Sequence, residues 1–204
     1  MYFSLSSSYA GNASAVKQSI TNYTANNCET QFFDWLVVSM KSVNEVLEGK
    51  PILFETNYIY PNSLNTTSIN FLNFDLLISH HDIHEFNDNS INEITEKYTR
   101  RYDRLITTIK EQQNIYFIRY CKNADNLEEQ EIIKFYKNII NINANLVFKF
   151  ILISDCDNLI IPNNLLIDNF IYINLNNYID DILNEENEYF KIIKKYKCVF
   201  NIVK

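Results

Sequence analysis

All four arginines and all three histidines of the chain fall between residues 80 and 119. They are Arg100, Arg101, Arg104 and Arg119, preceded by His80, His81 and His84. An arginine guanidinium donates two parallel hydrogen bonds from a planar fork and keeps its charge, which suits it to hold a carboxylate or a phosphate. The segment is therefore predicted to bind an anion. The alternative is a solvated helix face on which the arginines pair with Glu93, Glu96 and Asp103.

Apolar runs and helical repeats alternate along the chain and predict the elements that position these residues. From Ile91 to Lys110 apolar residues recur at intervals of three and four, which predicts an amphipathic helix that carries three of the arginines. Leu127–Ile140 predicts a second such helix. Ile115–Ile118, Leu146–Ile153 and Phe170–Ile173 are apolar runs typical of buried strands.

This alternation predicts an α/β fold, a three-layer sandwich with a mostly parallel, doubly wound sheet, in one domain over residues 1–204. Ligands bind beyond the carboxyl ends of the strands in such sheets. The polar residues expected at those ends are Ser6, Ser7, His80, His81, Asp82, Arg119 and Asp155. We therefore expect a site there, with Ser7 and Asp155 joining the four arginines in binding substrate.

Three interpretations of this site remain open. In the first, a serine at position 6, 7 or 8 is a nucleophile, with His80 or His81 as its base. Asp82 or Asp155 would then orient the imidazole. In the second, the arginines hold a phosphate or nucleotide-sugar while a histidine or Asp34 is the acid or base. In the third, the chain is an inactive relative that binds a partner protein through exposed aromatic residues.

Composition narrows the cofactors and partners. The net charge of −7 argues against general nucleic-acid binding, and two glycines are too few for a Walker or Rossmann phosphate loop. The four cysteines lack the spacing of a zinc site, and His80 and His81, as neighbours on an extended segment, would point to opposite faces. We expect no metal and no cofactor, and an anionic small molecule or a protein as substrate.

No apolar run approaches the length of a membrane span, so a cytoplasmic protein is predicted. The abundance of asparagine, isoleucine, tyrosine and lysine is typical of an AT-rich genome. One interpretation is that the source is a large DNA virus, in which case the protein would be in the host cytoplasm.

Asp34 also has a purely structural interpretation, because a carboxylate before a buried tryptophan can cap the next helix.

Five short motifs resemble those of a family described as putative papain-like cysteine peptidases. They are Ser4-Leu5 with its polar loop, Phe33-Asp34-Trp35-Leu36, a histidine followed by Asp82, Lys97-Tyr98-Thr99-Arg100-Arg101 with Arg104, and Phe117-Ile118-Arg119. The resemblance covers about residues 2 to 155 and implies kinship with that family. The chain departs from it where the family has glycine and cysteine, because Ser6 and Tyr9 stand there. The expected thiol nucleophile is missing, Cys28 is predicted to be a passive thiol, and cysteine proteolysis is not expected.

Overall fold

The computed structural model describes residues 1–6, 12–23, 30–54, 59–61, 67–83, 88–121, 127–156, 159–165 and 167–175. Ser7, Cys28 and His84 lie outside the described residues. None of the helices within these ranges combines the length and apolar content needed to cross a membrane.

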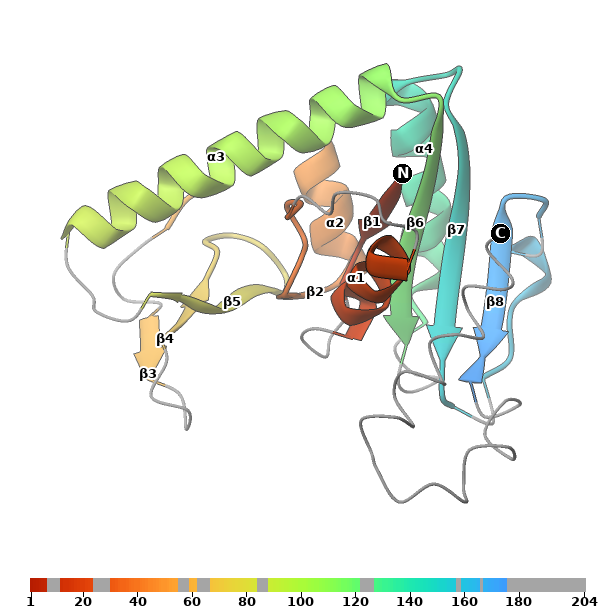
Figure 1. Ribbon diagram of the computed structural model, residues 1–204, viewed down its shortest axis with the longest axis horizontal. Coiled ribbons are helices and arrows are strands. Elements are labelled where there is room, and N and C mark those ends of the chain that lie inside the picture. The colour runs from red at the N-terminus through yellow and green to blue at the C-terminus, as the bar shows by residue number, and fades with distance from the viewer. Residues whose placement is uncertain are drawn as a thin grey trace.

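Four parallel strands form the central sheet (Figure 1). They are β1 (Tyr2–Ser4), β6 (Asn114–Cys121), β7 (Val147–Ser154) and β8 (Phe170–Asn174), in the order β1-β6-β7-β8. In the central strands β6 and β7 five consecutive residues are buried, as expected for strands covered on both faces. An all-parallel sheet with helices confirms the predicted α/β class. The order follows the sequence, so these strands contain no reversal of the kind that defines a doubly wound sheet.

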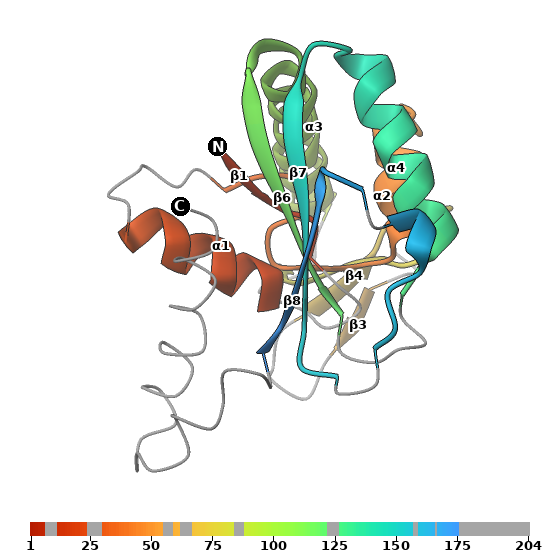
Figure 2. The same cartoon turned by 90° about the vertical axis from the view of Figure 1, so that its right-hand side faces the viewer.

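Helices lie on both sides of this sheet (Figure 2). On one side, α1 (Asn12–Tyr23) buries Val16 and Ile20 in a cluster with isoleucines of β6, β7 and β8. On the other side lie α4 (Glu129–Ile142) and α2 (Met40–Leu47). Phe135 of α4 contacts Phe117 edge-on with ring centroids 5.0 Å apart, which anchors that helix to β6.

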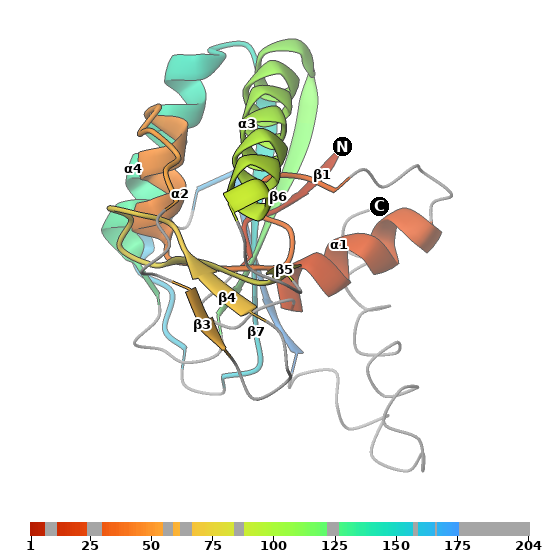
Figure 3. The same cartoon turned by 90° about the vertical axis from the view of Figure 1, so that its left-hand side faces the viewer.

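A second sheet is antiparallel, shares no strand with the parallel one and lies in front of it in Figure 3. It contains β2 (Leu36–Val38), β5 (Leu77–Ile83), β4 (Thr67–Asn70) and β3 (Ile59–Pro61), in that order. The predicted architecture has no such sheet. Three of its strands have only three or four residues, too few for an alternation of apolar and polar residues to reveal them.

The helix α3 (Asp88–Glu111) joins the two sheets, since it follows β5 and precedes β6. Its 24 residues correspond to roughly 36 Å at the usual rise per residue. Tyr98, near its middle, is buried against Phe32 and Phe71, with ring centroids 5.5 and 4.8 Å away. The predicted helices 91–110 and 127–140 and the three predicted strands from residue 115 onward are confirmed, with bounds that differ by up to three residues.

Candidate active site

A turn at residues 32–35, between α1 and β2, holds a buried carboxylate. Asp34 is 4% exposed, and its Oδ2 accepts hydrogen bonds from Lys17 Nζ at 2.5 Å and from the Gln31 backbone N–H at 2.7 Å. Lys17 belongs to α1 and is buried as well, so the two form an ion pair removed from water. Burial of both charges is tolerated because each has the other as its partner.

Serine hydroxyls near the end of β1 and in α1 connect the Asp34 turn to the parallel sheet. Ser4 Oγ lies 3.1 Å from Ser14 Oγ, and Ser14 Oγ accepts a hydrogen bond from the Trp35 N–H at 2.9 Å. The Ser6 hydroxyl donates to the Leu36 carbonyl, and the residue is completely buried. We refer to Ser4, Ser14, Lys17, Gln31 and Asp34 as the Asp34 centre. The predicted nucleophile Ser6 lies at its edge, with its hydroxyl proton used by the backbone.

Part of the Asp34 centre is left without partners. Asp34 Oδ1 and both polar atoms of the Gln31 side chain are buried and make no hydrogen bond. A polar group removed from water without a partner destabilises a fold, and most buried polar groups have one. The three atoms offer two acceptors and one two-proton donor, which is what a ligand with its own donors and acceptors requires.

Two residues beside the centre have strained backbones. Ser6 has φ of 52° and Trp35 has φ of 65°, in the left-handed region that side chains other than glycine, asparagine and aspartate rarely adopt. Strain of this kind persists only where the surroundings impose it, and it gathers at active sites and ligand-binding turns. Both residues donate their backbone N–H to a hydroxyl of the centre, Ser6 to Ser4 Oγ and Trp35 to Ser14 Oγ. Trp35 is 44% exposed.

Arg119 lies inside the molecule near the end of β6. Its Nη1 donates to the carbonyls of Leu5 and Val38 at 3.1 and 2.8 Å, and its Nη2 donates to Glu128 Oε2 at 2.9 Å. The pKa of Arg119 is lowered by burial, an effect that the neighbouring Glu128 charge opposes. Glu128 in turn accepts the first N–H of α2, from Met40, on both oxygens. The structure thus places Arg119 as a buried link between β1, β2 and α4.

The three arginines of α3 are more accessible. Arg100 is exposed, and the guanidinium of Arg101 lies 5.3 Å from the ring centre of Tyr98. Arg104 Nη1 donates to the carbonyl of Thr30 at 3.0 Å, next to Gln31. Within the described part of the chain no ion pair joins Arg100 or Arg101 to the acids of their own helix. Tyr98 and Arg104 therefore hold this side of α3 against the segment that leads into the Asp34 turn.

His80, His81 and Asp82 lie within β5 itself, where the prediction has them following a strand. The register between β4 and β5 shifts there: Thr67 pairs with Ile83 and Ile69 with Ser79, so β5 uses two extra residues. Such bulges are frequent beside active sites, where they change the direction of a side chain. Ser79 also pairs with Leu36, which puts the backbone of His80 next to the Asp34 turn.

The predicted residues are therefore only partly brought together. Ser6 bonds to Leu36, which follows the Asp34 turn and pairs with Ser79, the residue before the bulged segment of β5. Of the arginines of α3, Arg104 contacts the segment before that turn, at Thr30. Asp155 follows β7 at the same edge of the parallel sheet, but β6 separates it from β1. Sequence reasoning missed Lys17, Gln31 and Glu128. Lys17 left a signal, because it shares the helical spacing of the apolar Ala13, Val16 and Ile20.

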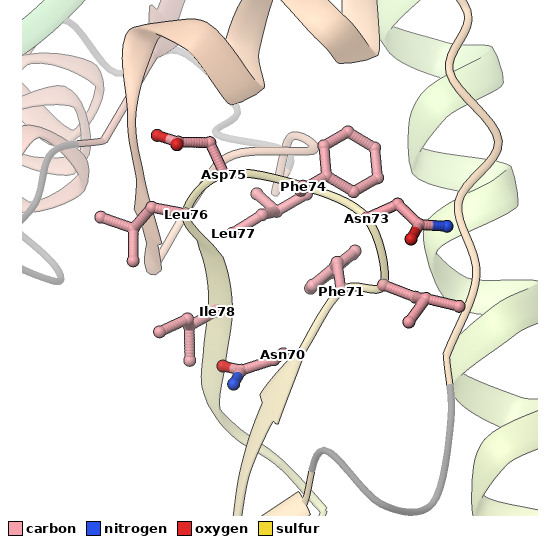
Figure 4. A pocket seen from close by; sticks show the side chains of 9 residues that line it. Asn70, Phe71, Asn73, Phe74, Asp75, Leu76, Leu77 and Ile78 are labelled. Atoms are coloured by element: carbon pink, nitrogen blue, oxygen red, sulfur yellow. The ribbon is translucent and has the colours of Figure 1, made fainter.

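A hollow lies at the turn between β4 and β5 (Figure 4). It has a volume of about 230 Å³ and is lined by residues 70–78, in the loop between β4 and β5 and the adjoining strand ends. None of the predicted site residues lines it. Lys50 donates to the carbonyl of Asn73 and lies 4.9 Å from the ring centre of Phe74, so the neighbouring cation already has partners.

Comparison with known families gives one match. Residues 42–158 match the family described as "Putative papain-like cysteine peptidase". The match covers more than half of the chain and includes the bulged strand, α3, Arg119 and Glu128, while Lys17 and Asp34 precede it. Searches of curated proteins and of solved structures found no match. The chain belongs to this family.

Proposed function

We propose that this member of the putative papain-like cysteine peptidase family is a hydrolase that acts on an anionic substrate at the Asp34 centre. Arg100 and Arg101 bind the anion, and Asp34 and a histidine of the β5 bulge transfer protons. Arg119 is a positioning residue, because it holds Leu5 and Val38 and through them the ends of β1 and β2. The same groups would serve a transferase with a different acceptor.

The observation that carries this proposal is the incomplete hydrogen bonding of the Asp34 centre. A structural ion pair needs no spare carboxylate oxygen, yet Asp34 Oδ1 and the Gln31 amide are buried and unpaired. Their cost is a physical reason to expect a ligand that completes them. The arginine pair adds the expectation of negative charge, since neither Arg100 nor Arg101 is paired with a described carboxylate.

Water is the nucleophile that suits these groups. The Ser6 hydroxyl already donates to Leu36, and the cysteine of the family pattern is replaced by Tyr9. In the proposed step a histidine takes a proton from water as its oxygen attacks the substrate, and then returns that proton to the leaving group. Histidine suits this role because its ordinary pKa is near neutrality. Lys17 supplies a fixed positive charge beside the reacting groups.

The test is a thermal-shift screen with inorganic phosphate, nucleotides, nucleotide-sugars and acidic peptides, compared between the wild type and Arg101→Lys. Lysine keeps the charge but not the fork of arginine, so a wild-type shift of several degrees should be lost in the variant. Lys110→Gln removes a charge from the last turn of the same helix and is the matched control. Hydrolysis of any ligand that binds is then measured with Asp34→Asn and His80→Gln.

A wild type that no ligand stabilises would overturn the proposal. It would favour the remaining candidate, an inactive relative that binds a partner protein. The observation on its side is the engagement of Ser6, whose buried hydroxyl cannot act as a nucleophile while it donates to Leu36.

A further inference from the structure

We propose that Trp35 is a specificity-determining residue, whose indole contacts a planar apolar group of the substrate beside the Asp34 centre. This inference deepens the proposed function and rests on it for the anionic part of the substrate. Trp35 is the one tryptophan of the chain and is 44% exposed, between the buried residues Asp34 and Leu36.

The backbone of Trp35 has a left-handed conformation, which is strained for a residue with a large side chain. Its φ of 65° is shared by Asn73, but asparagine tolerates the left-handed region while a bulky residue there is an outlier. The conformation is fixed from several sides: the Trp35 N–H donates to Ser14 Oγ, the Asp34 carboxylate holds the turn, and Leu36 starts β2. The fold thus imposes strain at this position.

Packing does not explain why a tryptophan stands at this strained position. An indole that filled the core would stabilise the fold enough to offset the strain, but nearly half of this side chain faces solvent. Glycine would adopt the same φ without strain. A large, exposed aromatic residue on a rigid backbone is a frequent contact in binding sites, because it offers broad apolar area with few rotatable bonds.

The position of Trp35 indicates the chemistry of the ligand. Its neighbour Asp34 belongs to the centre with unpaired acceptors, and the α3 arginines border the segment that leads into the same turn. A ligand that uses all three features carries a negative charge, hydrogen-bonding groups and a planar apolar group. We therefore infer an anionic substrate with an aromatic ring next to the reacting bond.

The probe for this inference is 8-anilinonaphthalene-1-sulfonate, a small anion with planar aromatic rings. It is titrated into the wild type, Trp35→Gly, Arg101→Lys and Asn73→Gly, and its emission under direct excitation is followed in all four. Its excitation by energy transfer from Trp35 is followed in the three proteins that keep the tryptophan. Thermal melting of each variant reports its fold. Asn73→Gly is the matched control, because it relieves the same φ in the turn between β4 and β5, which contains no residue of the Asp34 centre.

We expect Trp35→Gly to melt at or above the wild-type temperature, because glycine relieves the strain, and to bind the probe about tenfold more weakly. Asn73→Gly should bind like the wild type. If Trp35→Gly binds the probe as well as the wild type, or melts several degrees lower, the inference is wrong and Trp35 is structural.

The outcome separates this inference from the proposed function. Binding of inorganic phosphate depends on the arginines but not on the indole, so Arg101→Lys should lose it and Trp35→Gly should keep it. If phosphate and the other anions fail to stabilise the wild type while probe binding still requires Trp35, the contact stands and the anionic substrate does not. If Arg101→Lys no longer binds phosphate while Trp35→Gly binds the probe as well as the wild type, only the inference about Trp35 fails.

Discussion

Two ion pairs, Arg119–Glu128 and Lys17–Asp34, lie near the end of β1 and differ in how completely they are hydrogen bonded. Lys17 and Asp34 are both buried, whereas in the other pair Arg119 is buried and Glu128 is half-buried. Arg119 donates to two carbonyls and a carboxylate, and both oxygens of Glu128 accept from Met40. In the other pair one carboxylate oxygen has no partner, and the adjacent Gln31 amide has none either. Charge and burial alone therefore do not mark a functional site. The site that we propose differs from Arg119–Glu128 in its unfinished hydrogen bonding.

The physical basis of the comparison is desolvation. A buried charge is tolerated when its partners replace the water that it has lost, and its energetic contribution depends on how fully they do so. Arg119 and Glu128 find all their hydrogen-bond partners within the protein, so we assign them a structural role. Asp34 and Gln31 would be fully hydrogen bonded only with a bound ligand, and for this reason we propose the site there. Substitutions in the two pairs, in Gln31 and in an ion pair at the surface test this distinction.

Arg119→Met should lower the free energy of unfolding by about 3–5 kcal/mol, because it leaves Glu128 and two carbonyls near the end of β1 and β2 without their donor. Urea denaturation measures this change. Arg100→Met is the control, since it removes an exposed guanidinium from α3 and should change stability by less than about 0.5 kcal/mol. Equal effects of the two substitutions would contradict a structural role for Arg119.

Lys17→Met should lower the free energy of unfolding by about 3 kcal/mol, because the Asp34 carboxylate then remains buried without its counter-ion. The double variant Lys17→Met/Asp34→Leu should recover most of that loss, since it removes both charges. Ligand binding should not recover with it. A double variant that binds ligand like the wild type would show that Lys17 and Asp34 form a second structural pair.

Gln31→Leu should raise the free energy of unfolding by about 1 kcal/mol, because it replaces a buried amide without partners by an apolar side chain of similar size. The same variant should lose affinity for the substrate. Urea denaturation tests the predicted gain in stability, and the thermal-shift screen tests the predicted loss of affinity. If Gln31→Leu destabilises the protein, the amide is satisfied in solution and the centre is more complete than we infer.

Glu48→Gln tests a pair at the surface as a baseline. Burial would raise the pKa of Glu48, but hydrogen bonds from Lys134 and Asn138 and the Lys134 charge outweigh it and lower the pKa. The stabilisation is therefore present above the unfolded pKa and is lost as the pH falls through the folded one. With Glu48 41% exposed, we expect a difference of about 0.3 kcal/mol between wild type and variant near neutral pH that disappears as the pH falls through the lowered pKa. A difference independent of pH would contradict this assignment.

The long periodic elements of the fold could be predicted from the sequence, but the antiparallel sheet could not. The helix that contains Tyr98 and the strand that ends at Cys121 have enough residues for their periods to show. The strands β2, β3 and β4 depend on pairing with β5, and pairing between short segments leaves no trace in either one.

The site shows the same limit. Asp34 and the histidines could be singled out by residue type, and the carboxyl ends of the strands were the expected location. The partner of Asp34 could not be foreseen, because Lys17 lies 17 residues away on a helix that must first dock on the sheet. Nor could the role of Arg119 be read from its crowding with the other arginines, since its carbonyl partners are 114 and 81 residues distant.

The pairing of β1 with β6 also has a consequence for synthesis on the ribosome. Tyr2 pairs with Tyr116 and Phe3 with Phe117, so the first strand has no neighbour in its sheet until more than a hundred further residues have been translated. At the usual rate of elongation this delay is roughly 6–20 seconds. During that interval Phe3 and Leu5, which are fully buried in the finished protein, are unprotected apolar side chains. A nascent chain arrested before residue 114 should therefore be a substrate for chaperones, and one arrested well beyond residue 121 should not.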